Sequence, residues 1–401
     1  MRKILNCLLF YVFNLLLMGA IHVSLSVPID EYPMVVFYYL LWMVVSCFVF
    51  GIVYLLPIRV WIGWIPLFYI AIVALLFAVL LYGTEIKGGQ RWIDIGIIRF
   101  QPSEFSKLIL VLCISRYFDF FIKDRKCILS DVFGKLSLCR ILYFLLLYFF
   151  LFYSELYQDF QISLVLLIGI LVLYEVKIVD FIVIPIYLIY LQPDFATALI
   201  VFAISVTLVL LADWSKKSLL IGLRRAMWCI IWGIILFFQD YQWFRMYDFI
   251  NEPTFSYQVE QSLLAVRQGQ IWGSGIGENV VICLSYLPEI FTDFTFSTVL
   301  GEFGIIGACW LLFLYSGLIL TLISLAGKLE EKFCRLYVLG FASLIFWTVF
   351  LNVGSAIGIF PTVGIPLPFV SVGGSSMVMQ GAGLAICYRM FKEGKSIRAF
   401  F

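Results

Sequence analysis

Long apolar runs separated by short polar stretches make up most of the chain. A run of about 20 apolar residues is long enough to cross a bilayer as a helix. The clear runs lie near 4–26, 34–56, 61–82, 104–122, 195–213, 219–238, 294–325, 335–358 and 367–388. Three further runs, at 140–155, 160–174 and 178–191, are short for full spans. The pattern predicts an all-α, polytopic membrane protein.

Basic residues decide how many runs cross, because Lys and Arg collect in cytoplasmic loops. They cluster at 59, 123–140, 216–225, 328–335 and 389–398. If all these clusters face the cytoplasm, the three short runs all cross, which gives twelve spans with both termini cytoplasmic. Treating 160–191 as one helix gives eleven spans and places 216–225 outside. We prefer twelve.

The short runs have a possible origin in duplication. Residues 157–177 resemble 191–217, since Gln158 matches Gln192 and each is followed by Asp-Phe and an apolar run that ends in Lys. A duplicated helix pair within 156–191 would preserve the sidedness of everything after it. Chance similarity between two apolar runs is the alternative, and both stay open.

Composition agrees with this class. The chain is 63% hydrophobic and 13% charged, so it has no sizeable soluble domain, and we expect one integral membrane domain over 1–401 with a large extracytoplasmic loop at 239–293. Arg2 and Lys3 precede an apolar run without a cleavage site, which predicts an uncleaved first span. His22, the only histidine, is interpreted as a tolerated polar residue, and the ten cysteines show neither metal-ligand spacing nor a disulfide framework.

The twelve-span topology places four polar insets on the non-cytoplasmic face. They lie at 88–108, 191–198, 239–293 and 358–376. In the first, Glu104 and Lys107 are three apart and share a helical face, with Arg91 and Arg99 nearby. A purely structural ion pair is the alternative. The fourth inset is rich in Gly and Pro, which predicts a broken or re-entrant segment.

Three carboxylates stand at helix entrances. Glu289 and Asp293 precede the apolar run at 294–325, and Asp194 precedes the run at 195–213. A carboxylate at the mouth of a membrane helix is costly to desolvate and is a functional candidate by default. Solvated loop residues, and for Asp194 a helix cap, are the alternatives. Phenylalanines on both sides of Asp293 favour the functional interpretation.

Five motifs resemble one known family. They are GxQRWIxxGxxxFQPSExxK, QPDFxTA, YQxxQSxxAxxxGxxxGxGxG, LPExxTDFxF and GxxPxxGxPLPFxSxGGSS, in that order between Gly88 and Ser376. Together they resemble the SEDS family (shape, elongation, division and sporulation), the membrane peptidoglycan glycosyltransferases that include RodA and FtsW. The 97–104 and 364–371 segments look RodA-like, whereas 273–279 and 301–304 look nearer FtsW. The balance leans to RodA.

The resemblance implies a helical fold of ten spans, or twelve with the extra pair. It implies polymerisation of lipid II on the outer face of the bacterial cytoplasmic membrane, for elongation or division. The expected partners are lipid II, polyprenyl-linked glycan, membrane lipids and a single-pass transpeptidase (a class B penicillin-binding protein), with no nucleic acid. It implies an essential aspartate at Asp293. The residues expected to bind substrate are Arg91, Arg99, Gln101, Glu104, Lys107, Asp194, Gln258, Glu289, Thr292 and Ser375.

Some positions depart from the family pattern. Phe291 stands where a histidine is usual two residues before the aspartate, Gly301-Glu302 stands for a Glu-Glu pair, and Val372 replaces a tyrosine. Losing the histidine removes a possible second ionisable group beside Asp293.

The residues suit glycan transfer. An acceptor hydroxyl attacks the donor sugar and expels a lipid pyrophosphate, and Asp293 would take the hydroxyl proton. Lys107, Arg91 and Arg99 would neutralise the leaving group, as would Mg²⁺ or Mn²⁺ held by Asp293 and Glu289. A lipid flippase or other transporter, or a scaffold for wall enzymes, is the rival. Polar residues concentrated on one face, rather than at mid-depth, favour the enzyme.

Overall fold

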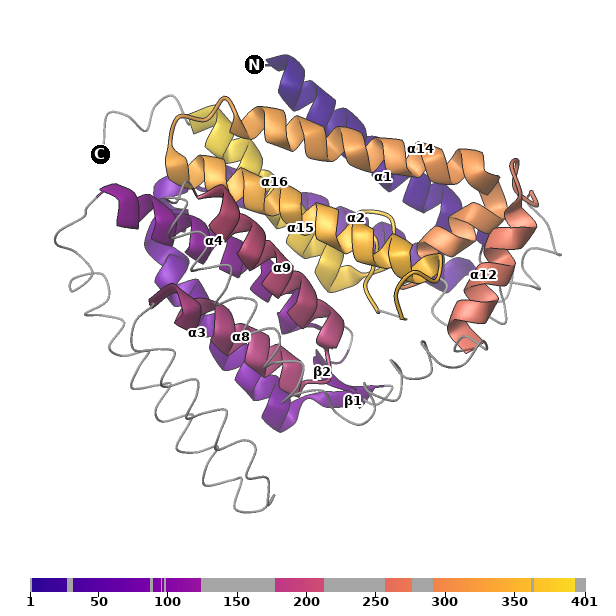
Figure 1. The fold of residues 1–401 in the computed structure, drawn as a ribbon, viewed down its shortest axis with the longest axis horizontal. Coiled ribbons are helices and arrows are strands. Elements are labelled where there is room, and N and C mark those ends of the chain that lie inside the picture. The colour runs from indigo at the N-terminus through magenta and orange to yellow at the C-terminus, as the bar shows by residue number, and fades with distance from the viewer. Residues whose placement is uncertain are drawn as a thin grey trace.

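The computed structural model describes residues 2–26, 32–86, 89–94, 96, 99–123, 177–212, 257–275, 291–361 and 364–393. These residues form ten helices and one small sheet (Figure 1). The helices are α1 (Arg2–Ser26), α2 (Tyr32–Leu55), α3 (Ile58–Tyr82), α4 (Pro102–Lys123), α8 (Lys177–Leu191), α9 (Phe195–Leu211), α12 (Tyr257–Gly269), α14 (Thr295–Ala326), α15 (Lys332–Ala356) and α16 (Gly374–Glu393). The strands are β1 (Thr84–Ile86), β2 (Gly89–Asp94) and β3 (Arg99–Phe100).

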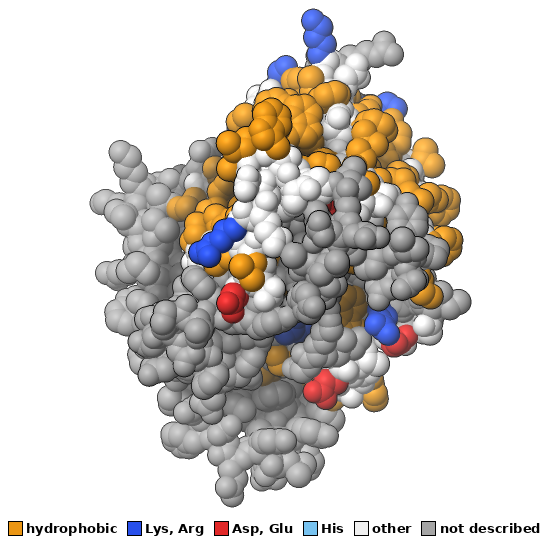
Figure 2. Space-filling model, turned by 90° about the vertical axis from the view of Figure 1, so that its right-hand side faces the viewer, with side chains coloured by type: hydrophobic (Ala, Val, Ile, Leu, Met, Phe, Trp, Pro, Cys, Tyr) orange, Lys and Arg blue, Asp and Glu red, His pale blue; other side chains and the backbone are white. Residues whose placement is uncertain are grey.

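The fold class predicted from the sequence is confirmed: this is a polytopic helical membrane protein. Five helices of the described residues are long and apolar enough to cross a membrane, namely Lys3–Leu25, Met34–Leu55, Ile58–Tyr82, Thr295–Ala326 and Lys332–Ala356. Many large apolar side chains point outward, among them Phe13, Phe37 and Phe48. Figure 2 shows hydrophobic side chains spread over much of the described surface with few charges among them. Lipid, rather than protein, would cover such a surface.

The helices differ in how deeply they lie in the bundle. In α15, 72% of the apolar window is buried, whereas the corresponding share is 11% in α2. α15 packs against α14, α4 and α9, and α16 packs against α2 (Figure 1). The core is therefore built around α15, and α2 presents most of its surface to lipid.

Most predicted runs coincide with helices, but the last one does not. The apolar run at 367–388 was expected to be a span, whereas α16 begins only at Gly374. Pro366 and Pro368 lack the N–H that a helix needs, and Phe369 has a positive φ of 64°, so the segment before α16 is irregular. The prediction of a broken segment in this inset is thus confirmed. The runs at 140–155, 160–174 and 219–238 lie outside the described residues.

The first polar inset folds as an antiparallel meander, which the sequence did not predict. β1 pairs with β2, with Thr84 opposite Trp92, and β2 pairs with β3, with Ile93 opposite Phe100. The side chain of Gln90 donates to the Gly83 carbonyl at 2.8 Å. These pairings satisfy backbone groups of the segment that follows α3. β3 leads directly into α4.

A glycine kink divides α14 into two halves. Gly304 has φ 66° and ψ −165°, a conformation open almost only to glycine. The kink frees backbone donors, and the loop after α12 accepts them: Ile305 N donates to the Gln270 carbonyl at 3.0 Å and Ile306 N to the Ile271 carbonyl at 3.3 Å. The kink is therefore tolerated within the bundle because neighbouring backbone satisfies it.

The same loop approaches α14 through a second glycine. A Cβ on Gly269 would overlap the Leu300 carbonyl oxygen, so only glycine fits at the end of α12. Beyond it, Ser274 donates to the Gly301 carbonyl through its amide at 3.0 Å and its hydroxyl at 2.7 Å. The Gly-punctuated stretch from Tyr257 to Gly275 thus braces the half of α14 that follows Asp293.

Candidate active site

An ion pair is buried in the first turns of α4. Pro102 is the first helical residue, where a missing N–H costs nothing. Lys107 Nζ lies 2.6 Å from Glu104 Oε1, and the side chains are only 2% and 4% exposed. The i,i+3 pair expected from the sequence is present, and it is a buried pair rather than a surface one. Among the described residues, Glu104 Oε2 has no hydrogen-bond partner although it is buried.

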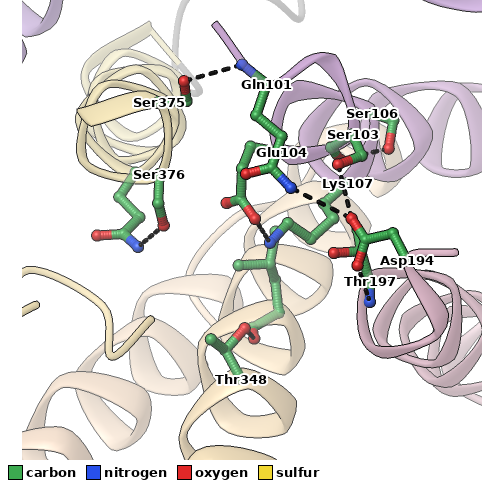
Figure 3. A network of polar contacts seen from close by, with 12 residues as sticks. Gln101, Ser103, Glu104, Ser106, Lys107, Asp194, Thr197, Thr348, Ser375 and Ser376 are labelled. Atoms are coloured by element: carbon green, nitrogen blue, oxygen red, sulfur yellow. Dashed lines mark hydrogen bonds and ion pairs between the residues drawn. The ribbon is translucent and has the colours of Figure 1, made fainter. Parts of the chain in front are cut away.

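Asp194 joins the second inset to the first. Its Oδ1 accepts from Thr197 N at 3.3 Å and so caps α9. Its Oδ2 accepts from Gln101 Nε2 at 3.2 Å and from Ser103 Oγ at 3.1 Å (Figure 3). The carboxylate therefore serves as the cap that the alternative interpretation required, and it also ties α9 to the beginning of α4.

The two arginines of the first inset have different surroundings. Arg91 Nε donates to the Gln192 carbonyl at 3.2 Å, and Arg91 Nη2 contacts the Pro193 carbonyl. Arg91 thus fastens β2 to the turn before α9. Arg99 is 64% exposed and lies 3.7 Å from Asp94. Arg99 is the arginine whose guanidinium is open to a ligand.

Asp293 lies in the turn that precedes α14. Asn352 of α15, which is fully buried, donates from Nδ2 to the Asp293 carbonyl at 2.8 Å and to the Ile365 carbonyl at 2.7 Å. A Cβ on Gly364 would lie 3.1 Å from Asp293 Oδ2. The carboxylate therefore packs against the fourth inset at a position where a larger residue would press on it.

The fourth inset closes over the same turn. Ser371 Oγ donates to the Thr292 carbonyl at 2.8 Å and lies 2.8 Å from Thr295 Oγ1. Val372 N donates to the Phe291 carbonyl, also at 2.8 Å. The backbone on both sides of Asp293 is thus fixed by hydrogen bonds from α15 and from the 364–372 segment.

Two serines of this inset connect the Asp293 turn with Gln101, the residue directly before α4. Ser371 contacts Thr292, and four residues later Ser375 Oγ accepts from Gln101 N at 3.1 Å (Figure 3). The structure therefore brings insets one, two and four and the end of inset three into one region. Glu289 lies outside the described residues, as does the side chain of Gln258. The substrate roles expected for the site residues stay predictions.

Sequence reasoning missed two groups. Asn352 and Ser371 hold the Asp293 turn, and an amide within an apolar run is a signal that could have indicated the first. His22 was interpreted as a tolerated polar residue, but its Nδ1 lies 3.0 Å from Glu302 Oε2, with the imidazole fully buried. Only the packing of α1 on α14 reveals that contact.

The described residues contain no group of three or more His, Cys, Asp or Glu side chains that could hold a metal ion. Of the two carboxylates expected to hold Mg²⁺ or Mn²⁺, Asp293 is among the described residues and Glu289 is not.

The comparisons with known proteins decide the family. The model of the FtsW, RodA and SpoVE cell cycle proteins matches residues 2–176 and 171–396. The chain belongs to this family. It is 31% identical over 349 residues to the peptidoglycan glycosyltransferase MrdB of Escherichia coli, covering 85% of this chain and 81% of MrdB. It is 29% identical over 364 residues to a probable peptidoglycan glycosyltransferase FtsW of Haemophilus ducreyi, covering 88% and 79%.

Solved structures of other proteins share the fold of this FtsW/RodA/SpoVE family member. A chain of a peptidoglycan synthase complex superposes with a TM-score of 0.71 at 22% identity, covering 96% of this chain and 97% of that chain. The rod shape determining protein RodA of Thermus thermophilus superposes with a TM-score of 0.62 at 23% identity, covering 96% of both. The chain therefore shares its fold with both of these proteins.

Proposed function

We propose that this chain is a peptidoglycan glycosyltransferase that polymerises lipid II on the outer face of the bacterial cytoplasmic membrane. The observation that carries this proposal is the 31% identity to MrdB, a peptidoglycan glycosyltransferase, over 85% of the chain. The clustered polar insets support it, because they give the membrane edge a set of carboxylates and cations that a scaffold does not need.

Asp293 is the general base of the proposed reaction. The acceptor hydroxyl forms a bond to the donor's anomeric carbon, the bond from that carbon to the pyrophosphate oxygen breaks, and the hydroxyl proton passes to the Asp293 carboxylate. Support comes from its setting: the residue is half-buried, and Asn352 and Ser371 bond to the backbone around it. A base held in this way loses little orientation entropy when the sugars bind.

Arg99 would bind the departing pyrophosphate and neutralise part of its charge. Its guanidinium is 64% exposed, whereas the Lys107 charge is already compensated by Glu104 within a buried pair. Arg91 is assigned to holding the second inset in place, since it donates to backbone carbonyls there. The Glu104–Lys107 pair, Gln101, Asp194 and Ser375 would then shape the pyrophosphate side of the donor site. Substrate-binding roles are also proposed for Thr292, Gln258 and Glu289.

A divalent cation, Mg²⁺ or Mn²⁺, remains a proposal. If one binds, Asp293 and Glu289 would supply the oxygen ligands that hard cations prefer, and the cation would neutralise pyrophosphate charge.

A partner and an orientation complete the proposal. The structural neighbour is part of a complex that coordinates polymerisation and crosslinking. We therefore expect a single-pass transpeptidase of the class B penicillin-binding type beside this chain. The positions of the basic clusters predict that both termini of this chain are cytoplasmic. Co-purification from membranes with such a protein tests the partner.

The decisive experiment is polymerisation of labelled lipid II by the purified, detergent-solubilised protein, with and without the transpeptidase. Asn keeps the size of Asp but cannot accept the proton, so Asp293→Asn should fold normally and polymerise at least about 10²-fold slower. Glu289→Gln should cost less. Glu85→Gln, at an exposed carboxylate on β1, is the matched control and should retain the wild-type rate.

The outcomes separate the rival functions. Glycan from wild type but not from Asp293→Asn supports the proposed base. A wild-type rate in Asp293→Asn would end that assignment. A flippase or scaffold would form no glycan even as wild type.

A further inference from the structure

A buried histidine connects α1 with the first half of α14. The His22 side chain on α1 is fully buried. Its Nδ1 lies 3.0 Å from Glu302 Oε2, and its Nε2 lies 3.1 Å from Thr298 Oγ1. Thr298 and Glu302 are four residues apart and share one face of α14, so one imidazole reaches both. Ionisable groups this deep in a membrane helix bundle are costly, which makes the contact a functional candidate.

Both ring nitrogens of His22 have a polar partner on α14. The Thr298 hydroxyl donates to the Thr295 carbonyl at 2.9 Å, so its oxygen is free to accept from His22 Nε2–H. A buried polar pair whose members lie within hydrogen-bond distance of each other is the form that an apolar interior tolerates.

The part of α14 that this pair contacts begins directly after the Asp293 turn. The half-helix from Thr295 to the Gly304 kink carries the Asp293 turn at its beginning. The His22 ring also lies against the Phe291 ring, with centroids 6.5 Å apart. From α12, Ser262 Oγ lies 2.5 Å from Ser297 Oγ, so the half-helix is held by polar contacts from two elements. Directional contacts in a low dielectric fix the rotation of a helix more firmly than apolar packing alone.

We propose that His22 is a positioning residue, which fixes the half-helix through Thr298 and Glu302 and thereby sets where the Asp293 carboxylate points. This inference rests on the proposed role of Asp293 as the base. The competing explanation is a pair that contributes only to folding, as a satisfied buried ion pair can.

Substitutions at both ends of the pair distinguish these explanations. His22→Leu should lower kcat for lipid II polymerisation by about tenfold or more while KM stays unchanged, because a displaced base impairs the chemical step and not binding. Glu302→Gln keeps an amide that can donate to Nδ1 and should retain most of kcat. Asn14→Leu is the matched control, because among the described residues the Asn14 side chain of α1 bonds only to the Phe10 carbonyl of its own helix.

The double variant His22→Leu/Glu302→Leu is the control for a loss of activity that results only from misfolding of His22→Leu. It removes both members of the His22–Glu302 contact, so it should reach the wild-type amount and melting temperature. Its kcat should nevertheless remain low. A folded double variant with wild-type kcat, or His22→Leu with wild-type kcat, would overturn the proposal.

Amide hydrogen exchange over residues 291–303, measured without substrate, tests how firmly the half-helix is held. Exchange should be faster than in wild type in the double variant. If wild type forms no glycan, the proposed function fails, whereas faster exchange would still support the grip on the half-helix. If wild type forms glycan and the double variant matches it in kcat and exchange, only the present inference fails.

Discussion

Separating the two members of the buried Glu104–Lys107 pair should be costly in free energy. Lys107 Nζ and Glu104 Oε1 are 2.6 Å apart, and the side chains are 2% and 4% exposed. Removing one partner of such a pair strands the other charge away from water and costs about 3–5 kcal/mol of stability. We therefore expect Glu104→Ala and Lys107→Ala each to lower the free energy of unfolding by about this amount.

An exposed pair in the same inset supplies the comparison. Arg99 and Asp94 are 3.7 Å apart, with side chains 64% and 35% exposed. Exposed ion pairs contribute about 0–1 kcal/mol. Asp94→Ala should therefore leave the free energy of unfolding within about 1 kcal/mol of wild type, measured by denaturant titration of the detergent-solubilised protein.

A double variant tests whether the pair matters beyond stability. Glu104→Leu/Lys107→Met removes both charges, and such replacements are commonly neutral or stabilising by about 1–4 kcal/mol. If the pair shapes the donor site, this variant should be folded but slow in lipid II polymerisation. Near-normal stability in both single variants would refute the burial argument, and wild-type polymerisation by the double variant would remove the pair from the site.

Three further predictions concern Asn352, the Gly304 kink and the membrane topology. Asn352→Leu removes the amide that donates to the Asp293 and Ile365 carbonyls, and each lost hydrogen bond should cost about 1–3 kcal/mol. The variant should therefore have a lower melting temperature and a lower polymerisation rate than wild type, whereas Asn14→Leu should change neither. Gly304 has φ 66°, so Gly304→Ala should lower the free energy of unfolding by about 1–3 kcal/mol through backbone strain alone. A Cβ at Gly51 would meet nothing within 4 Å, so Gly51→Ala should be neutral or stabilising. Equal melting temperatures of the two variants would contradict this prediction. Cysteine labelling should place positions 135 and 216 on the same side of the membrane, and opposite sides would exclude twelve spans.

The amino-acid sequence by itself determined the class of protein and the locations of most of the helices that the structure describes. Apolar runs of bilayer length have few alternatives, because a backbone in lipid must satisfy its own hydrogen bonds. The i,i+3 spacing of Glu104 and Lys107 likewise predicted their contact, since helical geometry fixes which side chains meet. Pro and Gly in the fourth inset predicted its broken backbone, although not that α16 begins at Gly374.

Only the tertiary structure decided which polar groups meet across the bundle. Asn352 reaches Asp293 from 59 residues away in sequence, and His22 reaches Glu302 from 280 residues away. No local pattern encodes such contacts, because they depend on which helix faces which and at what rotation. The same holds for Arg99 and Lys107: their sequence settings look alike, but packing leaves the first exposed and buries the second with a partner. The residue types were visible in the sequence, whereas their partners came from packing.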